Sequence, residues 1–474
     1  MAAKNCIINV LDEVWCKISG LSVPDEKLLY EEYAIFADGY LFMPAFKLRR
    51  WDGKIRFIDA NGKTYVRLLD EIIPKIENMG YSVDLDDKRD PIDPPNTVCT
   101  ADRFSHIEMK GKPFMIRDYQ VDAINSAIAE TNGFIIAGTG AGKTTITAGI
   151  SDIFSKAGIK TLTVVPSDDL VKQTSEWYKM LGMDVGIYSG SQKDLEPMNI
   201  VGTWQAIQNN LDLLMQFGCL IWDEAHGAKA TVAQKILNEA GKHIAFRFGV
   251  TGTLPKSKID MMSLKASIGL VIKEIPAWWL IENGYLAELK IQPVQITEVK
   301  VDEDFPAYGD EKTFVSKSKD RMNKIADIIV TQAATYGNTL VLVNSVEFGK
   351  KLSAGIPDSV FLYGKNSSEE RFEQYDMFDH VDGKIVIANS QIASTGISID
   401  RVFCLIMIDA GKSFVKAIQS VGRGLRLAND KKHLVVVDIY SKLKWGTKHH
   451  KERLKYYKEA KYPVLDPVKI KSLD

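Results

Sequence analysis

The sequence has few of the residues from which covalent cross-links and metal centres are built. Its 474 residues include only five cysteines and seven histidines. The cysteines are odd in number and widely scattered, which excludes a disulfide framework and is typical of buried thiols in a reducing compartment.

Long apolar runs and an excess of one charge are also lacking. No uninterrupted apolar stretch approaches the ~18 residues of a membrane span, and acids interrupt the amino-terminal apolar pattern too early for a signal peptide. The formal net charge is −1, so any nucleic-acid surface must come from local clusters of Lys and Arg. We therefore expect a soluble, cytoplasmic protein without a membrane partner.

Length and patterning predict several domains. The chain is 45% hydrophobic and 26% charged, as in globular proteins, and is too long for one ordinary domain. The acidic, proline-bearing segment Asp84–Asn96 predicts a linker. Beyond residue 112, short β-branched runs alternate with helical patterns in two series, which predicts βαβ units and two parallel-sheet lobes. The predicted strands are 133–138, 161–166, 199–203, 219–223, 244–250, 288–301, 338–344, 359–364, 384–389, 403–409 and 433–439.

A glycine-rich segment, Ala137–Thr145, follows the first of these strands. Its glycines allow a tight turn whose N–H groups point inward, and the helix expected from Lys143 adds its positive dipole end. Lys143 is placed to reach the β- and γ-phosphates, and the Thr144 hydroxyl to hold Mg²⁺. The segment therefore predicts a site for ATP and Mg²⁺.

The predicted strand 219–223 leads into Asp223, Glu224 and His226. Acids at this point either cap the next helix or lie at the sheet edge where open α/β sheets bind ligands. A zinc site is disfavoured because no H-x-x-x-H or C-x-x-C pair lies nearby. With a phosphate loop in the same lobe, Asp223 would complete the coordination of Mg²⁺ opposite Thr144, and Glu224 would orient and deprotonate the attacking water. His226 would link the site to neighbouring groups.

These segments resemble the motifs of the superfamily 2 helicases, and further motifs follow in the expected order up to residue 426. Phe114–Gln120 looks like the adenine-recognising Q-motif, and Ala137–Thr144 has the family's A-x-x-G-x-G-K-T form. Asp223–His226 matches the DEAH box, and Thr251–Thr253 stands where the family has a Ser/Thr-x-Thr coupling motif. The resemblance implies two tandem RecA-like lobes.

The resemblance also implies roles for individual residues. QSVGRGLR matches the family's Q-x-x-G-R-x-x-R, whose arginines reach the nucleotide from the second lobe and stabilise charge on the transferred phosphoryl group. The implied catalytic residues are Lys143, Asp223, Glu224, His226, Gln419, Arg423 and Arg426. The implied nucleotide-binding residues are Arg117, Tyr119, Gln120, Gly138, Gly140, Gly142, Lys143, Thr144 and Thr145. Polynucleotide contacts are implied for Ser167, Thr203 and Thr395, which would equally serve as helix caps.

The segment Asp38–Asp59 resembles the N-terminal domain of the bacteriophage UvsW helicases, which reshape branched DNA. The T5-type phages carry a branch-migration relative of these helicases, and the resemblance implies that the chain belongs with it. The segment interleaves basic and aromatic residues, which suit phosphates and unpaired bases. DNA contacts are expected from Arg49, Arg50, Trp51, Lys54 and Arg56. The alternative is a β-hairpin turning at Trp51–Lys54 with solvated charges; we expect both the hairpin and DNA contact. The basic segment Lys442–Lys461 is either a solvated helix face or a duplex-gripping tail.

Together these observations predict an α/β protein with two tandem RecA-like parallel-sheet lobes and a small N-terminal α+β accessory domain. The predicted parts are the accessory domain with its linker (1–96), the first lobe (97–275), the second lobe (276–445) and a basic C-terminal tail (446–474). The expected function is ATP-dependent remodelling of branched DNA, including forked and four-way (Holliday) junctions, D-loops and R-loops, in phage recombination, replication and repair. The alternatives are an RNA or RNA–DNA hybrid helicase and an ATP-gated nucleic-acid-binding protein. A monomer is favoured.

Overall fold

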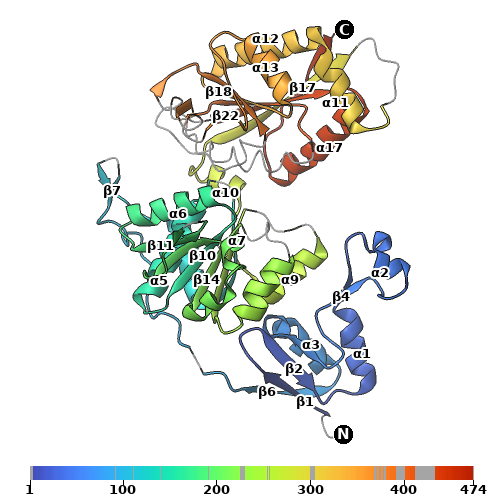
Figure 1. Cartoon of the computed structure of the whole chain (residues 1–474), viewed down its shortest axis with the longest axis vertical. Coiled ribbons are helices and arrows are strands. Elements are labelled where there is room, and N and C mark those ends of the chain that lie inside the picture. Colours follow the sequence, from blue (N-terminus) through green and yellow to red (C-terminus); the bar gives the residue numbers. More distant parts are fainter. Residues whose placement is uncertain are drawn as a thin grey trace. The chain divides into compact units, whose positions relative to one another are not determined.

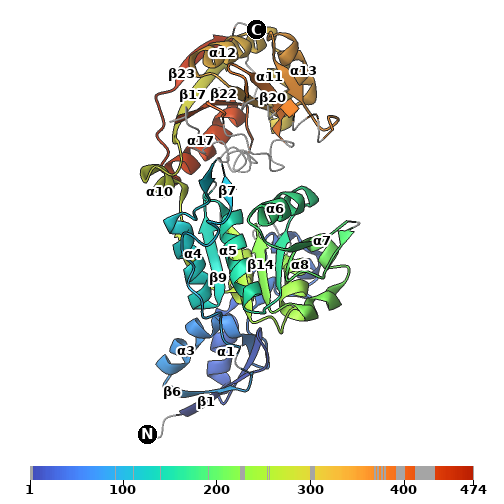
Figure 2. The same cartoon turned by 90° about the vertical axis from the view of Figure 1, so that its left-hand side faces the viewer.

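A computed structural model describes the chain in two compact units (Figures 1 and 2). The first extends to Ile275, apart from residues 139–141, and the second begins at Pro276. The residues described are 4–90, 92–109, 111–138, 140–190, 192–224, 230–252, 255, 257–298, 305–367, 370, 373–374, 377, 380–390, 401–411 and 433–472. Among them, no helix has both the length and the apolar character that a membrane span requires. Each unit contains a large parallel sheet, which confirms the expected fold class.

The first unit starts with the small α+β domain. Its four-stranded sheet has the order β5-β2-β1-β6, in which only the β1–β6 pair is parallel. Alternate residues of β1 are buried, as expected for a sheet with one covered face. The elements are β1 (Lys4–Val10), β2 (Trp15–Ser19), α1 (Val23–Glu32), β3 (Ala34–Phe36), η1 (Tyr40–Phe42), α2 (Pro44–Lys47), β4 (Lys54–Arg56), β5 (Lys63–Tyr65), η2 (Val66–Leu68), α3 (Leu69–Asn78) and β6 (Tyr81–Asp87).

The first lobe contains an eight-stranded sheet with the order β12-β11-β13-β10-β14-β15-β9-β16, parallel except at β12. Its strands are β9 (Asn132–Ala137), β10 (Thr161–Val165), β11 (Val185–Ser189), β12 (Gln192–Lys193), β13 (Asn199–Thr203), β14 (Cys219–Asp223), β15 (Phe246–Thr251) and β16 (Val271–Ile275). The other elements are β7 (Glu108–Met109), β8 (Lys112–Pro113), α4 (Asp118–Glu130), α5 (Lys143–Lys156), α6 (Asp168–Met180), α7 (Trp204–Ile207), η3 (Leu211–Gln216), α8 (Ala230–Ala233), η5 (Gln234–Ala240) and α9 (Lys258–Ile268).

The second unit contains a seven-stranded parallel sheet with the order β19-β20-β18-β21-β22-β17-β23. Its strands are β17 (Glu288–Glu298), β18 (Thr339–Val343), β19 (Val360–Leu362), β20 (Ile385–Asn389), β21 (Cys404–Ile408), β22 (His433–Ser441) and β23 (Val468–Ser472). Its described helices include α10 (Ala277–Glu282), α11 (Tyr308–Lys317), α12 (Lys319–Tyr336), α13 (Val346–Ala354) and α17 (Lys444–Glu459).

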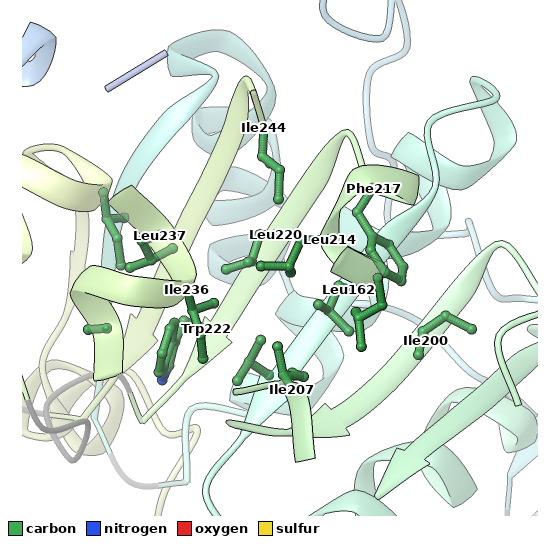
Figure 3. Packing of buried hydrophobic residues seen from close by; sticks show 14 of the residues in the cluster. Leu162, Ile200, Ile207, Leu214, Phe217, Leu220, Trp222, Ile236, Leu237 and Ile244 are labelled. Carbon is green, nitrogen blue, oxygen red and sulfur yellow. The ribbon is translucent and has the colours of Figure 1, made fainter. Parts of the chain in front are cut away.

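The hydrophobic core of the first lobe fixes the central strand β14 in place. Leu220 and Trp222 of this strand pack with Ile207 and Ile236 on one face of the sheet (Figure 3). Because side chains alternate along a strand, Cys219, Ile221 and Asp223 face the opposite side.

Three expectations from the sequence are corrected. The Trp51–Lys54 hairpin is wrong, because β4 pairs with the more distant β3 and α2 lies between them. The linker does not start at Asp84, because β6 continues to Asp87. Residues 446–474 do not form a separate tail, because α17 and β23 belong to the second unit and β23 joins its sheet.

Candidate active site

The glycine-rich loop joins β9 to α5, as its sequence predicts. Gly142 is the N-cap of α5 and has a φ of 75°, a left-handed conformation that favours glycine. A Cβ at this position would lie 2.3 Å from Nε2 of Gln120. The loop therefore needs glycine at 142 both for its backbone conformation and for the close approach of the Gln120 side chain.

The start of α4 carries the predicted adenine-recognition residues. Gln120 is buried, and its Oε1 accepts a hydrogen bond from the backbone N–H of Arg117 at 3.1 Å. The Arg117 guanidinium donates to the hydroxyl of the buried Tyr119 at 3.0 Å. The structure thus brings these three residues together, with Gln120 directly against Gly142.

Asp223 lies on the face of the sheet that α5 covers. In the register between β14 and β15, Cys219 is opposite Phe246 and Ile221 is opposite Phe248. Both phenylalanines pack against Phe154 of α5, with ring centroids 4.8 and 5.6 Å apart. Since Asp223 shares the face of Cys219 and Ile221, it lies at the carboxyl end of the sheet on the side of the phosphate-loop helix.

The next acid, Glu224, pairs with the loop lysine. Its backbone N–H donates to the Val250 carbonyl at 2.8 Å and to Oδ1 of Asp223 at 3.0 Å. Its φ of 50° is a left-handed conformation that is strained for a residue with a Cβ. In this position its Oε1 lies 3.2 Å from Nζ of Lys143. Two segments far apart in sequence therefore place an acid and an amine at one sheet edge.

A buried polar cluster near this edge was not predicted from the sequence. The hydroxyl of the buried Tyr178 lies 3.1 Å from Oγ1 of Thr163 and also hydrogen-bonds Thr147 of α5. Burial raises the pKa of Tyr178, and the charge of Asp223 contributes to the increase. The signal available in the sequence was a pair of alternating threonines in an otherwise apolar strand, together with a tyrosine on the inner face of an amphipathic helix.

The predicted polynucleotide contacts have structural roles of their own. Ser167 and Thr203 are N-caps: their hydroxyls accept from the N–H groups of Leu170 at 3.4 Å and Ala206 at 3.3 Å. Thr251 is buried at the end of β15. The capping role leaves DNA contact by Ser167 and Thr203 as a prediction.

The basic residues of the accessory domain divide into two groups. Lys54 and Arg56 form ion pairs within the domain, whereas Arg49 and Arg50 are exposed. The indole N–H of Trp51 donates to the Lys54 carbonyl at 2.9 Å. The remaining predicted site residues, and the last residue of the Thr251–Thr253 motif, lie outside the described part of the chain: His226, Thr253, Thr395, Gln419, Arg423 and Arg426.

Three family models match successive parts of the chain. "DNA helicase UvsW, N-terminal" matches residues 24–86, and "Type III restriction enzyme, res subunit" matches 113–256. "Helicase conserved C-terminal domain" matches 320–428. The matches follow the order of the accessory region and the two lobes.

Similarity to individual helicases agrees with these family matches. The "ATP-dependent DNA helicase uvsW" of Enterobacteria phage T4 is 25% identical over 92% of this chain and 93% of its own length. The "Probable helicase D10" of Escherichia phage T5 is 22% identical over 65% of this chain and 68% of its own length. The crystal structure of T4 UvsW shares the fold, with a TM-score of 0.50, 22% identity and coverage of 98% of this chain and 99% of that one.

Proposed function

We propose that this chain, a phage UvsW-like ATP-dependent DNA helicase of superfamily 2, uses ATP hydrolysis to remodel branched DNA. Its matches to the helicase families make it a hydrolase that uses a nucleotide. The proposal adds the branched substrate, which includes forks and four-way junctions, and the roles of individual residues. It also includes action in the cytoplasm of the phage's host, a DEAH-box assignment and a relation to the T5-type helicases.

The observation that carries the catalytic part is the 3.2 Å approach of Lys143 Nζ to Glu224 Oε1. In the proposed cycle Lys143 leaves Glu224 when ATP arrives and binds the β- and γ-phosphates. The released carboxylate of Glu224 then orients a water molecule and takes its proton as the water attacks the γ-phosphate. Arg423 and Arg426 are proposed to stabilise the charge that develops on the transferred group.

The residues at the sheet edge also fit Mg²⁺. Thr144 supplies a hydroxyl and Asp223 a carboxylate, and Mg²⁺ prefers such oxygen ligands. Both residues adjoin the Lys143–Glu224 pair in sequence, and Asp223 lies on the face of the sheet that α5 covers. When bound there, the ion would neutralise charge on the β- and γ-phosphates. Gln120, with Arg117 and Tyr119, would hold the adenine.

The preference for DNA is supported by the accessory domain. The UvsW N-terminal match covers most of it, and the domain is joined to the first lobe by direct contacts. The Trp15 indole N–H donates to the Asn238 carbonyl at 3.2 Å, and the Glu13 N–H donates to the Lys242 carbonyl at 3.1 Å. A nucleic-acid contact made by this domain is therefore mechanically connected to the lobe that carries Lys143 and Glu224.

The test measures ATPase rates with single-stranded, duplex, forked and four-way DNA, together with ATP-dependent conversion of a synthetic four-way junction. We expect the branched DNAs to stimulate hydrolysis most, and Lys143→Met to abolish both activities. Matched RNA junctions provide the comparison that separates a DNA motor from an RNA helicase. The proposal fails if no DNA raises the ATPase rate, or if RNA junctions stimulate more strongly than DNA junctions.

A further inference from the structure

The segment between β3 and β4, residues 37–53, projects from the accessory domain and carries α2 (Figure 1). We call it the 37–53 projection. Three of its large apolar side chains are strongly exposed: Phe42 at 79%, Leu48 at 61% and Leu41 at 55%. A single exposed apolar residue needs no explanation, but several within one small segment mark an interaction surface.

The exposure of Phe42 does not arise from a loose loop. Tyr40 stacks on Phe36 with ring centroids 4.6 Å apart and contacts Phe46 edge to face at 4.9 Å. Gly53 lies so close to these rings that a Cβ there would approach Tyr40 to 2.6 Å. The Phe42 N–H donates to the Gly39 carbonyl at 2.9 Å. Ring contacts among Phe36, Tyr40 and Phe46 thus order the projection, and its backbone holds Phe42 in an exposed position.

Three exposed cations belong to the same segment as the exposed apolar residues. Lys47, Arg49 and Arg50 are exposed, and none of them forms an ion pair with another residue of the described chain. Arg49 has a φ of 54°, a conformation that costs ~1 kcal/mol or more for a residue other than glycine. The Arg50 N–H donates to the Ala45 carbonyl at 2.9 Å, which fixes the end of α2. The two arginines therefore have a defined backbone in the projection, and their charges are available to a ligand.

Lys54 and Arg56 follow the projection in β4 and form contacts at its base. Lys54 Nζ lies 2.6 Å from Oε2 of Glu31, and Arg56 Nη2 lies 2.5 Å from Oδ2 of Asp52. The Arg56 guanidinium also covers the ring of Tyr30 at 4.3 Å. These contacts join β4 to α1, so we assign Lys54 and Arg56 a structural role rather than phosphate binding.

We propose that the 37–53 projection is a wedge that places Phe42 against the terminal base pair at a DNA branch point, while Arg49 and Arg50 contact the flanking phosphates. This inference rests on the proposed function and specifies which part of the substrate the accessory domain recognises. A branch point exposes the flat apolar face of a base pair with phosphates at its rim, which matches a projection that carries both an exposed ring and exposed cations. A continuous duplex offers the phosphates but not the exposed face.

The first test compares the full-length protein with Phe42→Ala on forked DNA and on a closed circular duplex, which has no branch. Loss of one stacked base predicts affinity for the fork about tenfold weaker, with affinity for the circle unchanged. Phe42→Trp should retain the affinity because it preserves a stacking ring. Leu85→Ala is the matched control, since Leu85 is 55% exposed on the same domain but outside the projection. All variants should keep the melting temperature of the wild type.

The second test separates stacking from phosphate contact through the salt dependence of fork binding. Arg50→Ala should reduce the slope of log affinity against log salt by about one unit, whereas Phe42→Ala should leave the slope unchanged. The wedge is refuted if Phe42→Ala binds the fork as tightly as the wild type, or loses the same factor on the circle; the exposed ring would then suit a protein partner. Those results would leave junction conversion by the wild type intact, whereas failure of that conversion would overturn the proposed function itself.

Discussion

The Lys143–Glu224 pair makes the proposed site testable, because it predicts that one substitution changes binding and turnover in opposite directions. Glu224→Gln keeps the shape of the side chain but removes its charge and its ability to take a proton. If Lys143 must leave Glu224 to bind ATP, the glutamine variant should bind ATP more tightly than the wild type while hydrolysing it far more slowly.

The exposure of the pair limits the effect on binding, and the ordinary contribution of a general base sets the effect on turnover. The side chains of Lys143 and Glu224 are 16% and 28% exposed, so the pair is partly screened by water and contributes at most about 1 kcal/mol. Affinity for ATP should therefore rise by no more than about fivefold. Loss of the general base should reduce turnover by about 10²- to 10⁴-fold.

The assay combines a titration with a fluorescent ATP analogue and steady-state ATPase rates at saturating forked DNA. Glu130→Gln, at an exposed position at the end of α4, controls for the general effect of removing one negative charge. Turnover close to that of the wild type would remove Glu224 from its role as base. Weaker ATP binding would show that Lys143 and Glu224 do not exchange partners as we infer.

Three further predictions concern the loop, the projection and the second lobe. Gly142→Ala should weaken ATP binding at least tenfold, because its Cβ would displace Gln120; a nucleotide titration measures this. Hydrogen bonding from Arg56, with a smaller contribution from the Lys54 backbone N–H, lowers the pKa of Asp52 to about 2. The stabilising pair is therefore complete above the unfolded value of ~4 and is lost as the pH falls towards about 2. Carboxyl NMR should show this midpoint, and Arg56→Gln should raise it towards ~4. Asp438→Asn should lower the free energy of unfolding by ~3–5 kcal/mol, measured by denaturant titration, because it breaks a fully buried ion pair.

Each of these predictions has a control and a contrary outcome. Gly158 has a φ of 82° with open space around it, so Gly158→Ala imposes the backbone strain without a clash, and equal ATP binding by both alanine variants would contradict the role of Gln120. A midpoint near 4 for Asp52 in both proteins would disprove its pairing with Arg56. Asp320→Asn, which removes an acid from a partly exposed pair with Lys324, should cost less than about 1 kcal/mol. A similarly small cost for Asp438→Asn would contradict the stabilising role of the buried ion pair.

The sequence predicted the elements that depend on local patterns. The β-branched runs at the sheet centres became strands, because a strand covered on both faces is apolar at nearly every position. In the two large sheets the strands β11, β12, β16 and β23 were not predicted, and all four occupy outer positions. Polar residues interrupt β16, and β23 carries lysines at alternate positions, as in a partly exposed strand. Asp52–Gly53 alone predicts a tight hairpin, but Pro44 begins helix α2 shortly before it. Because this helix occupies the preceding residues, β4 pairs with β3 instead.

The basic helix α17 has a buried structural role that its composition did not predict. Its polar residues His450, Arg453 and Tyr457 are buried against β22, where all three contact the carboxylate of Asp438. Burial alone would raise the pKa of Asp438, but Arg453 and His450 more than offset it, so the pKa is below its usual value. The i, i+3, i+7 spacing was present in the sequence, but only the fold shows that a buried acid lies opposite it.

The junction between the accessory domain and the first lobe affects how this protein can be dissected. Ala266 and Met262 of α9, in the first lobe, pack into the hydrophobic core of the accessory domain. A truncated motor that starts after the linker would carry this apolar stripe into solvent and would tend to aggregate. An experiment that deletes the accessory domain would therefore change solubility and substrate choice at the same time. Single substitutions in the 37–53 projection would leave the core shared by the domain and α9 intact.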